Sequence, residues 1–243
     1  MKIDVQRLQK ELGITAEYFD SIDSTMRYAN DQILQKKRPP DAVVANFQTN
    51  GVGRVGRSFF SPESTGLYLT LILDESVFPF GDVTPRIALA VSDAIQNVFD
   101  LSCGIKWVND LYLGSRKVSG ILCRKVGAYY SIGIGVNVEK PESIPKDLED
   151  RFGYLTESCD PDKYTELLCE IYKSCIHWSC VDKGHTLSCY RNRCNHIGKK
   201  IQLYRNDRNL FGICTGIDDD FSIVTDVDGE VMKFSSGEMS III

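Results

Sequence analysis

The chain has 243 residues, of which 43% are apolar, so it can bury a sizeable core in one or two domains. Its 28 basic residues (Lys and Arg) against 33 acidic residues give a formal charge of −5, which disfavours a general nucleic-acid binder. No apolar run approaches the roughly 18 to 20 residues of a membrane span, and the opening MKIDVQRLQKELG lacks the apolar core of a signal peptide. We therefore expect a cytoplasmic protein with neither a nucleic acid nor a membrane as partner.

The nine cysteines, an odd number without a secretory signal, favour reduced thiols over a disulfide framework. Four of them lie near three histidines in the sequence, namely Cys175, Cys180, Cys189 and Cys194 with His177, His185 and His196. No Cys-x-x-Cys pair occurs here, although structural zinc sites commonly use such short spacings. We expect ordinary thiols and no metal site.

The first half of the chain, from about residue 15 to residue 138, alternates strands with helices. A short strand ends near Ile22, and Ser24 or Thr25 then caps a helix; the two hydroxyls could equally bind a polar, neutral ligand. The segment GLYLTLIL is a strand that places Leu67, Leu69, Leu71 and Leu73 on one side. A helix over 84–99 follows, with Thr84 as cap, Pro85 at the first position and a buried stripe of Ile87, Val91, Ala94, Ile95 and Val98.

The second half is expected to contain one more helix, over 161–178, and then short strands joined by turns from about residue 196. The buried side of that helix carries Leu167, Leu168, Ile171 and Cys175. A Val-Asp-Gly-Glu turn at 227–230 joins two of the strands. This tail is typical of a small β-barrel.

Three segments contain residues that are typical of a ligand site. The loop NGVGRVGR interleaves Gly51, Gly53 and Gly56 with Arg54 and Arg57, which suits an anion held by backbone N–H groups and guanidinium forks. It is not a Walker loop, since no Gly-Lys-Ser/Thr follows and a strand comes next; a basic surface loop is the alternative.

The strand YYSIGIGVNV has one face of apolar side chains and one face with almost none, formed by Ser131, Gly133, Gly135 and Asn137. Glycines weaken a strand, so the bare face predicts that either a ligand or a packed helix or strand approaches the backbone closely. With a ligand there, Asn137 would offer paired donor and acceptor groups to a planar base.

The segment KWVNDLYLGSRKVSGIL places two lysines, an arginine, an asparagine and an aspartate between two apolar runs. A solvated hairpin would explain the composition, because turns collect such residues for backbone reasons. An anion site is the functional alternative.

Taken in order, SIDST, Gln48 with NGVGRVGR, FFSPESTGLYLTL, KWVNDLYLGSRKVSGIL, GIGVNV and KFSSGEMSI resemble biotin protein ligase (biotin–[acetyl-CoA-carboxylase] ligase) over about residues 15–243. The resemblance implies an α+β fold: a class II synthetase-like catalytic domain over 1–192, with a mixed β-sheet flanked by helices, and a small SH3-like β-barrel over 193–243. It also implies that biotin and ATP form biotinyl-5′-AMP, and that biotin then passes to one lysine of a biotin carboxyl carrier protein. Mg²⁺ is expected to accompany the ATP.

The resemblance also assigns roles to residues of this chain. Lys117 and Arg54 are the catalytic candidates, since cations must offset the repulsion between biotin carboxylate and ATP phosphate. Biotin binding is assigned to Ser24, Thr25, Met26, Gln48, Gly53, Arg54, Trp107, Lys117 and Gly120. ATP and adenylate binding is assigned to Gly51, Arg57, Phe59, Lys106, Asn109, Asp110 and Asn137. Trp107 either forms a wall of the biotin pocket or belongs to the hydrophobic core. Asp110 is a candidate to orient or deprotonate the amine of the carrier lysine. Asn109 is a candidate to position the phosphates or Mg²⁺.

Several positions depart from the family pattern. The glycine loop commonly reads GRGRRG, whereas Val52 and Val55 replace two arginines here, which predicts weaker retention of the adenylate. Val108 stands where proline is frequent, Met26 where asparagine is frequent, and Phe59 where tryptophan often follows the loop. Phe59 can still stack on an adenine, with less area.

About 20 residues precede SIDST, which is too few for the DNA-binding domain that some family members carry, so we expect a ligase of the short form without DNA-binding activity. Two alternatives remain: a lipoate protein ligase, and a biotin-binding module that does not transfer. The sequence leaves open whether the chain is a monomer or a homodimer.

Overall fold

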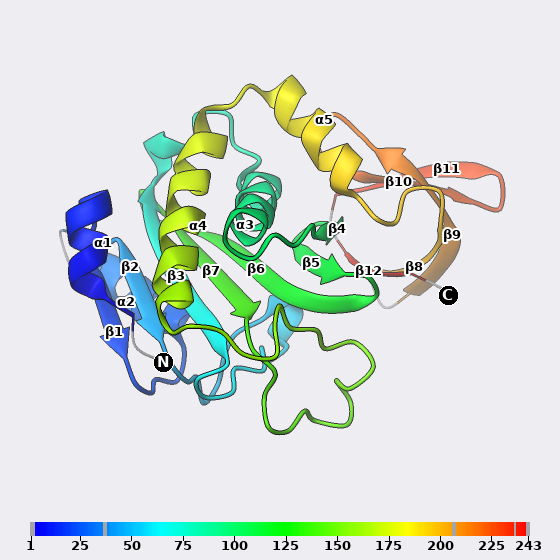
Figure 1. The fold of residues 1–243 in the computed structure, drawn as a ribbon. Helices are drawn as coiled ribbons and strands as arrows, with labels where there is room; N and C mark the ends of the chain where they lie inside the picture. The colour runs from blue at the N-terminus through cyan, green and yellow to red at the C-terminus, as the bar shows by residue number, and fades with distance from the viewer. Residues whose placement is uncertain (1–2, 36–37, 206–207, 236, 242–243) are drawn as a thin grey trace.

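The computed structural model describes residues 3–35, 38–205, 208–235 and 237–241. Its larger sheet has the strand order β1 (Ala16–Phe19), β2 (Ala42–Ala45), β3 (Gly66–Asp74), β7 (Tyr129–Asn137), β6 (Arg116–Val126), β5 (Asp110–Leu113) and β4 (Gly104–Lys106) (Figure 1). Strands β1 and β2 are parallel, and the other neighbours are antiparallel. The predicted α+β class with a mixed sheet is confirmed.

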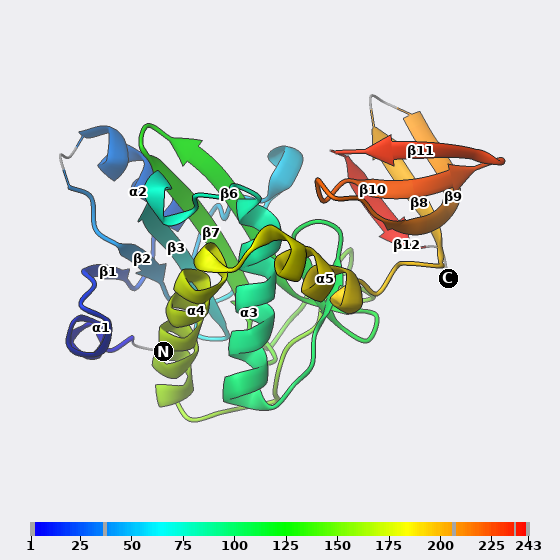
Figure 2. The same cartoon turned by 90° about the horizontal axis from the view of Figure 1, so that it is seen from above.

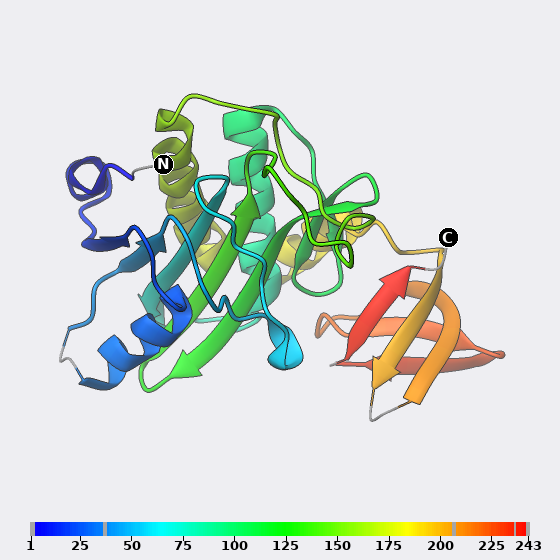
Figure 3. The ribbon, with the colours of Figure 1, turned by 90° about the horizontal axis from the view of Figure 1, so that it is seen from below.

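Helices cover both faces of this sheet (Figures 2 and 3). Helices α3 (Val83–Phe99) and α4 (Asp162–Cys180) pack together on one face, and α2 (Thr25–Gln35) covers the other. Helix α1 (Val5–Leu12) lies beside β1, and α5 (Lys183–Arg193) leads to the second sheet. Two short 3₁₀ turns, Arg54–Gly56 and Glu75–Val77, flank β3. Of the helices in the described part of the chain, none combines the length and apolar character that a membrane crossing requires.

Strand β3 shows why both faces of the sheet are covered. Its leucines Leu67, Leu69 and Leu71 are fully buried in the main core, which includes the α3 stripe. Ile72 points to the opposite face and packs with Val43 and the α2 residues Ala29 and Ile33. Because successive side chains of a strand alternate between faces, a strand that is apolar at nearly every position needs cover on both.

The predicted helices are present, but one helix start was wrong. Helix α3 begins at Val83, so Thr84 is not its cap and Pro85 is not its first residue. The residue before it, Asp82, has a left-handed backbone (φ 51°) and caps no N–H with its side chain. Proline is still tolerated at the third position, where its missing N–H would have had no partner within the helix. Helix α4 extends to Cys180, two residues beyond the predicted end.

The C-terminal strands form a second, antiparallel sheet of five strands in the order β11 (Glu230–Phe234), β10 (Ile223–Val227), β9 (Arg208–Ile217), β8 (Lys200–Arg205) and β12 (Glu238–Ile241). The predicted turn at 227–230 joins β10 and β11, with Asp228 and Gly229 both at positive φ. Within the described residues, β11 and β12 are edge strands and do not pair with each other, so the sheet is open in its hydrogen bonding.

Candidate active site

A cavity of about 900 Å³ opens between the larger sheet, the glycine loop and the second sheet. Strands β4 to β7, the start of α2, the loop that follows β7 and strand β12 all contribute to its lining. All the predicted site residues except Gly51 line this cavity: Ser24, Thr25, Met26, Gln48, Gly53, Arg54, Arg57, Phe59, Lys106, Trp107, Asn109, Asp110, Lys117, Gly120 and Asn137. Gly51 lines a smaller adjoining cavity of about 310 Å³.

Asn109, Asp110 and Lys117 of KWVNDLYLGSRKVSGIL meet in one cluster because β5 pairs with β6, whereas the exposed Arg116 donates to the Glu149 and Phe152 carbonyls instead. Lys117 Nζ lies 2.8 Å from Asp110 Oδ1, and Asn109 Nδ2 donates to the same oxygen at 3.1 Å. Asn109 Nδ2 also donates to the Ile121 carbonyl at 2.8 Å, which fixes the amide plane. The segment is therefore not a freely solvated hairpin, and its cation and carboxylate both face the cavity.

Arg54 of the glycine loop joins this cluster. Its Nη1 donates to Asn109 Oδ1 at 2.8 Å, and its Nη2 donates to the Gly237 carbonyl of the second sheet at 3.2 Å. One guanidinium thus bridges the glycine loop, the Asn109 side chain and the C-terminal sheet. The loop is not a solvent-exposed basic loop at this position.

Lys106 provides a second cation in the cavity. Its Nζ donates to the Tyr112 hydroxyl at 3.3 Å and lies 5.3 Å from the centre of that ring. Burial lowers the pKa of the Lys106 amine below its ordinary value, and the charge of Asp110 opposes this effect. Anionic phosphates in the cavity would favour the charged amine further.

The start of α2 forms an uncharged, hydrogen-bonding end of the cavity. Gln48 Oε1 accepts from the Thr25 N–H at 2.9 Å and from the Thr25 hydroxyl at 3.2 Å, while Gln48 Nε2 donates to Ser61 Oγ at 2.9 Å. The buried Ser24 hydroxyl accepts from the Arg27 N–H at 3.4 Å, so its predicted capping role is confirmed. These groups can recognise a polar, neutral ligand head without introducing charge.

The bare face of β7 is covered by side chains of two other segments. A Cβ atom on Gly135 would lie 2.3 Å from Phe59 Cε1, and one on Gly133 would lie 3.5 Å from the Met26 methyl carbon. Gly135 therefore admits the Phe59 ring, and Gly133 admits Met26 of helix α2, which packs against β7, so the packed-helix alternative is borne out in part. Asn137 at the end of the face donates to the Lys117 and Gly153 carbonyls at 3.3 and 2.8 Å, so its amide nitrogen is already engaged; its contact with adenine stays a prediction.

The sequence model of the biotin/lipoate A/B protein ligase family matches residues 18–137. A Bacillus subtilis protein named bifunctional ligase/repressor BirA is 32% identical over 255 residues, spanning 92% of this chain and 73% of that protein. The chain belongs to the biotin/lipoate A/B protein ligase family. A Salmonella typhimurium bifunctional ligase/repressor BirA is 28% identical over 98% of this chain and 78% of its own length. The fold is similar to that of a biotin protein ligase from Aquifex aeolicus in complex with biotin and ATP, with a TM-score of 0.77, 24% identity and coverage of 93% and 98% of the two chains.

In this family member, the loop after β7 adds site residues that the sequence analysis missed. Residues 151–153 run alongside Lys117, whose N–H donates to the Arg151 carbonyl at 2.7 Å and whose carbonyl accepts from the Gly153 N–H at 2.8 Å. Arg151 and Phe152 line the cavity, as do Tyr112 and three residues of β12, Met239, Ser240 and Ile241. Arg151 and Phe152 lie in a loop without a ligand-site pattern, whereas Tyr112 lies within KWVNDLYLGSRKVSGIL and the three β12 residues lie within KFSSGEMSI, two motifs in which these positions were not assigned a role.

The oxygen donors of the ligase cavity suit a magnesium ion brought in by phosphates. Among the described residues, no group of three or more His, Cys, Asp or Glu side chains could hold a metal alone. The carboxylates of Asp110 and Asp150 both line the cavity, and Mg²⁺ bound to nucleotide phosphates typically takes one or two protein carboxylates.

All nine cysteines are free thiols, and burial raises the pKa of several of them, that of Cys103 and that of Cys123 to about 12.

Proposed function

We propose that this protein is an ATP-dependent biotin protein ligase that forms biotinyl-5′-AMP and then transfers biotin to a lysine of a biotin carboxyl carrier protein. The observation that carries the proposal is the composition of one cavity in a member of this family. Its neutral end has Ser24, Thr25 and Gln48, and its other side has the cations Arg54, Lys106 and Lys117. That polarity matches a ligand with an uncharged ring system and an anionic tail.

In the first step, a biotin carboxylate oxygen attacks the α-phosphorus of ATP, the bond to the β-phosphate oxygen breaks, and pyrophosphate leaves. Both reactants are anions, so the role assigned to Lys117 is to hold the carboxylate and the α-phosphate together while charge redistributes between them. Asp110 holds Lys117 in place at 2.8 Å before substrate arrives. Mg²⁺, when bound to the phosphates, would neutralise charge on the leaving pyrophosphate, with Asp110 and Asp150 as its protein ligands.

The intermediate must then be kept from water, because a mixed anhydride hydrolyses. Arg54 is suited to this role, since its bonds to Asn109 and Gly237 attach the glycine loop, which lines the cavity, to both sheets. In the second step, the carrier lysine attacks the acyl carbonyl as a neutral amine, the bond to phosphate breaks and AMP leaves; the nitrogen then loses a proton. Asp110 remains the candidate to orient that amine.

We also propose two domains, over 1–192 and 193–243, the second of SH3-like type. The five antiparallel strands of the second sheet and the short turns between them support that assignment. The carrier protein as partner and a cytoplasmic location belong to the same proposal.

The test is incubation of the purified chain with ATP, Mg²⁺, labelled biotin and a biotin carboxyl carrier domain. We expect pyrophosphate release and label on the carrier, and no label on a carrier whose target lysine is replaced. Lipoate in place of biotin should give neither product. Pyrophosphate exchange that is supported by lipoate and not by biotin would indicate a lipoate ligase. Biotin binding without formation of biotinyl-5′-AMP would indicate a module that does not transfer.

A further inference from the structure

The turn between β9 and β10, residues 218–222, packs against the back of the KWVND segment. Trp107 Nε1 donates to the Phe221 carbonyl at 2.8 Å, and both side chains are buried. Trp107 follows Lys106 and comes two residues before Asn109, so this bond anchors the segment that carries the cavity's polar groups. The C-terminal sheet is thus attached directly to that segment.

A second anchor comes from α5. Tyr190 is fully buried, and its hydroxyl donates to the Val108 carbonyl at 3.1 Å. Its ring meets the Phe221 ring edge-on, with centroids 5.5 Å apart and planes at 85°. Trp107 is therefore hydrogen-bonded to the turn, and Val108 is hydrogen-bonded to Tyr190, whose ring packs against Phe221 of the same turn.

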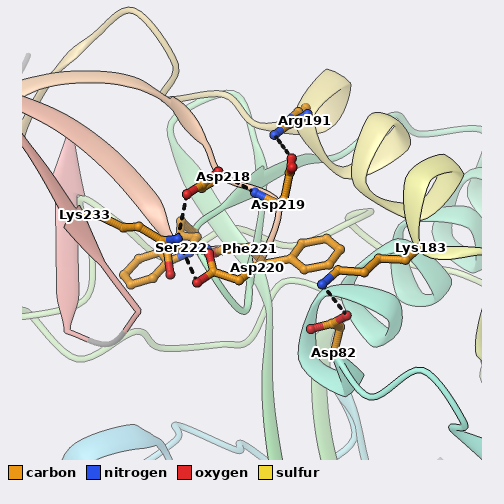
Figure 4. A network of polar contacts seen from close by, with 10 residues as sticks. Asp82, Lys183, Arg191, Asp218, Asp219, Asp220, Phe221, Ser222 and Lys233 are labelled. Atoms are coloured by element: carbon orange, nitrogen blue, oxygen red, sulfur yellow. Dashed lines mark hydrogen bonds and ion pairs between the residues drawn. The ribbon is translucent and has the colours of Figure 1, made fainter.

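Charged groups link the turn to α5 and β11 (Figure 4). Lys233 pairs with Asp218 at 2.6 Å and with Asp220 at 2.9 Å, and Arg191 pairs with Asp219 at 3.1 Å. The Asp218 N–H also donates to the Ser222 carbonyl at 2.8 Å, which closes the turn.

Phe221 has a left-handed backbone with φ of 61°, which is unfavourable for a residue with a large side chain. Such a conformation persists only where the surroundings determine it, and here it points the Phe221 ring at Tyr190 and its carbonyl at Trp107. A glycine would adopt this φ more easily but would provide no ring.

We propose that Phe221 and Tyr190 are positioning residues for adenylate formation, acting on Lys106, Asn109 and Asp110 through Trp107 and Val108. The inference rests on the proposed ligase function. Groups that act on a reacting centre must be held to within about half an ångström, and supporting contacts supply that precision. The C-terminal sheet is then part of the adenylation machinery, although Phe221 and Tyr190 do not line the cavity.

The test compares Tyr190→Phe and Phe221→Leu with Tyr164→Phe. Tyr164 is a matched control, because it is also a buried tyrosine whose hydroxyl donates, to Glu139 and the Ser64 carbonyl, away from the KWVND segment. Pyrophosphate release gives kcat and KM for ATP, the adenylate burst counts active sites, and melting temperature reports stability.

We expect kcat/KM for ATP per active site to fall roughly tenfold in Tyr190→Phe and further in Phe221→Leu, while Tyr164→Phe keeps the wild-type value. A merely structural role would lower the number of active sites and the melting temperature but leave KM and kcat per site unchanged, and that result would overturn the inference. Tyr190→Phe retains the ring and removes one atom, so it decides the question if Phe221→Leu does not fold. If the wild-type protein forms no adenylate from biotin, the proposed function fails and this inference falls with it.

Discussion

Replacing Lys117 by methionine removes the cation of the central cluster and keeps most of the side-chain volume. The amine lies in the cavity, 2.8 Å from Asp110, and its side chain is 30% exposed. It is therefore partly shielded from water, and an effective dielectric constant near 20 is a reasonable choice. At that value, a unit charge about 4 Å from the amine interacts with it by about 4 kcal/mol.

Losing this interaction with the reacting phosphate and carboxylate should lower kcat/KM for adenylate formation by roughly a thousandfold, since each 1.36 kcal/mol is a factor of about ten. The assay is pyrophosphate release with saturating biotin and varied ATP, normalised to active sites. Lys125→Met is the matched control, because Lys125 lies on the same strand but is exposed and pairs with Glu75. It should behave as wild type.

A Lys117→Met variant that melts like the wild type and keeps kcat/KM within tenfold would refute the role given to this amine. The unpaired Asp110 carboxylate left behind could destabilise the variant, so a double variant with Asp110→Asn is the companion measurement. The reference for the double variant is Asp110→Asn alone, because Asp110 has its own proposed role; if the double variant regains the melting temperature but stays far slower than Asp110→Asn, the loss belongs to the missing cation rather than to unfolding.

Three further predictions concern stability and geometry. Gly120→Ala would place a Cβ 3.0 Å from both Lys117 Nζ and Phe59 Cε2, so adenylate formation should fall about tenfold with little change in melting temperature. Arg86 is buried and donates to the Trp178 and Val181 carbonyls, near the end of α4. Arg86→Met should therefore lower the free energy of unfolding, measured by urea titration, by about 3 kcal/mol. The KM for ATP should not change. Burial lowers the pKa of His196 to about 4, from 6.5. The unfolded chain therefore binds a proton first, so stability should fall by about 3 kcal/mol as the pH drops from 6.5 to 4, and unfolding of His196→Gln should lack this dependence.

The parts of the site that the sequence predicted are those whose chemistry and local geometry are coded in consecutive residues. KWVND forms the turn between β4 and β5, and RKVSGIL belongs to β6, which pairs with β5, so their polar groups converge over few residues. The glycines of β7 likewise predicted a close approach to the backbone. What approaches them, the Phe59 ring, is more than 70 residues away in the sequence, and local patterning carries no information about such a partner.

Contacts between the two sheets were the least predictable. Arg54 and Gly237 are 183 residues apart, and the bond between them uses a backbone carbonyl, which has no residue identity to recognise. The pairing of residues 151–153 with Lys117 is also made by backbone groups. Helix α5 was missed because its sequence has no apolar stripe of helical period; only Thr186, Leu187 and Tyr190 are buried on it.

These backbone contacts bear on the two valines of the glycine loop. Relative to the common GRGRRG pattern, Val52 and Val55 remove two charges that could hold an anionic adenylate. Arg54 nevertheless joins Asn109 to the Gly237 carbonyl, so the loop is attached to both the hairpin and the second sheet by hydrogen bonds that do not depend on those charges. Weaker retention of the adenylate stays a prediction, and we expect the attachment of the loop to the C-terminal sheet through Arg54 to offset part of that loss. If so, the anchoring of the sheet at Trp107 and Val108 bears on the chemistry in the cavity.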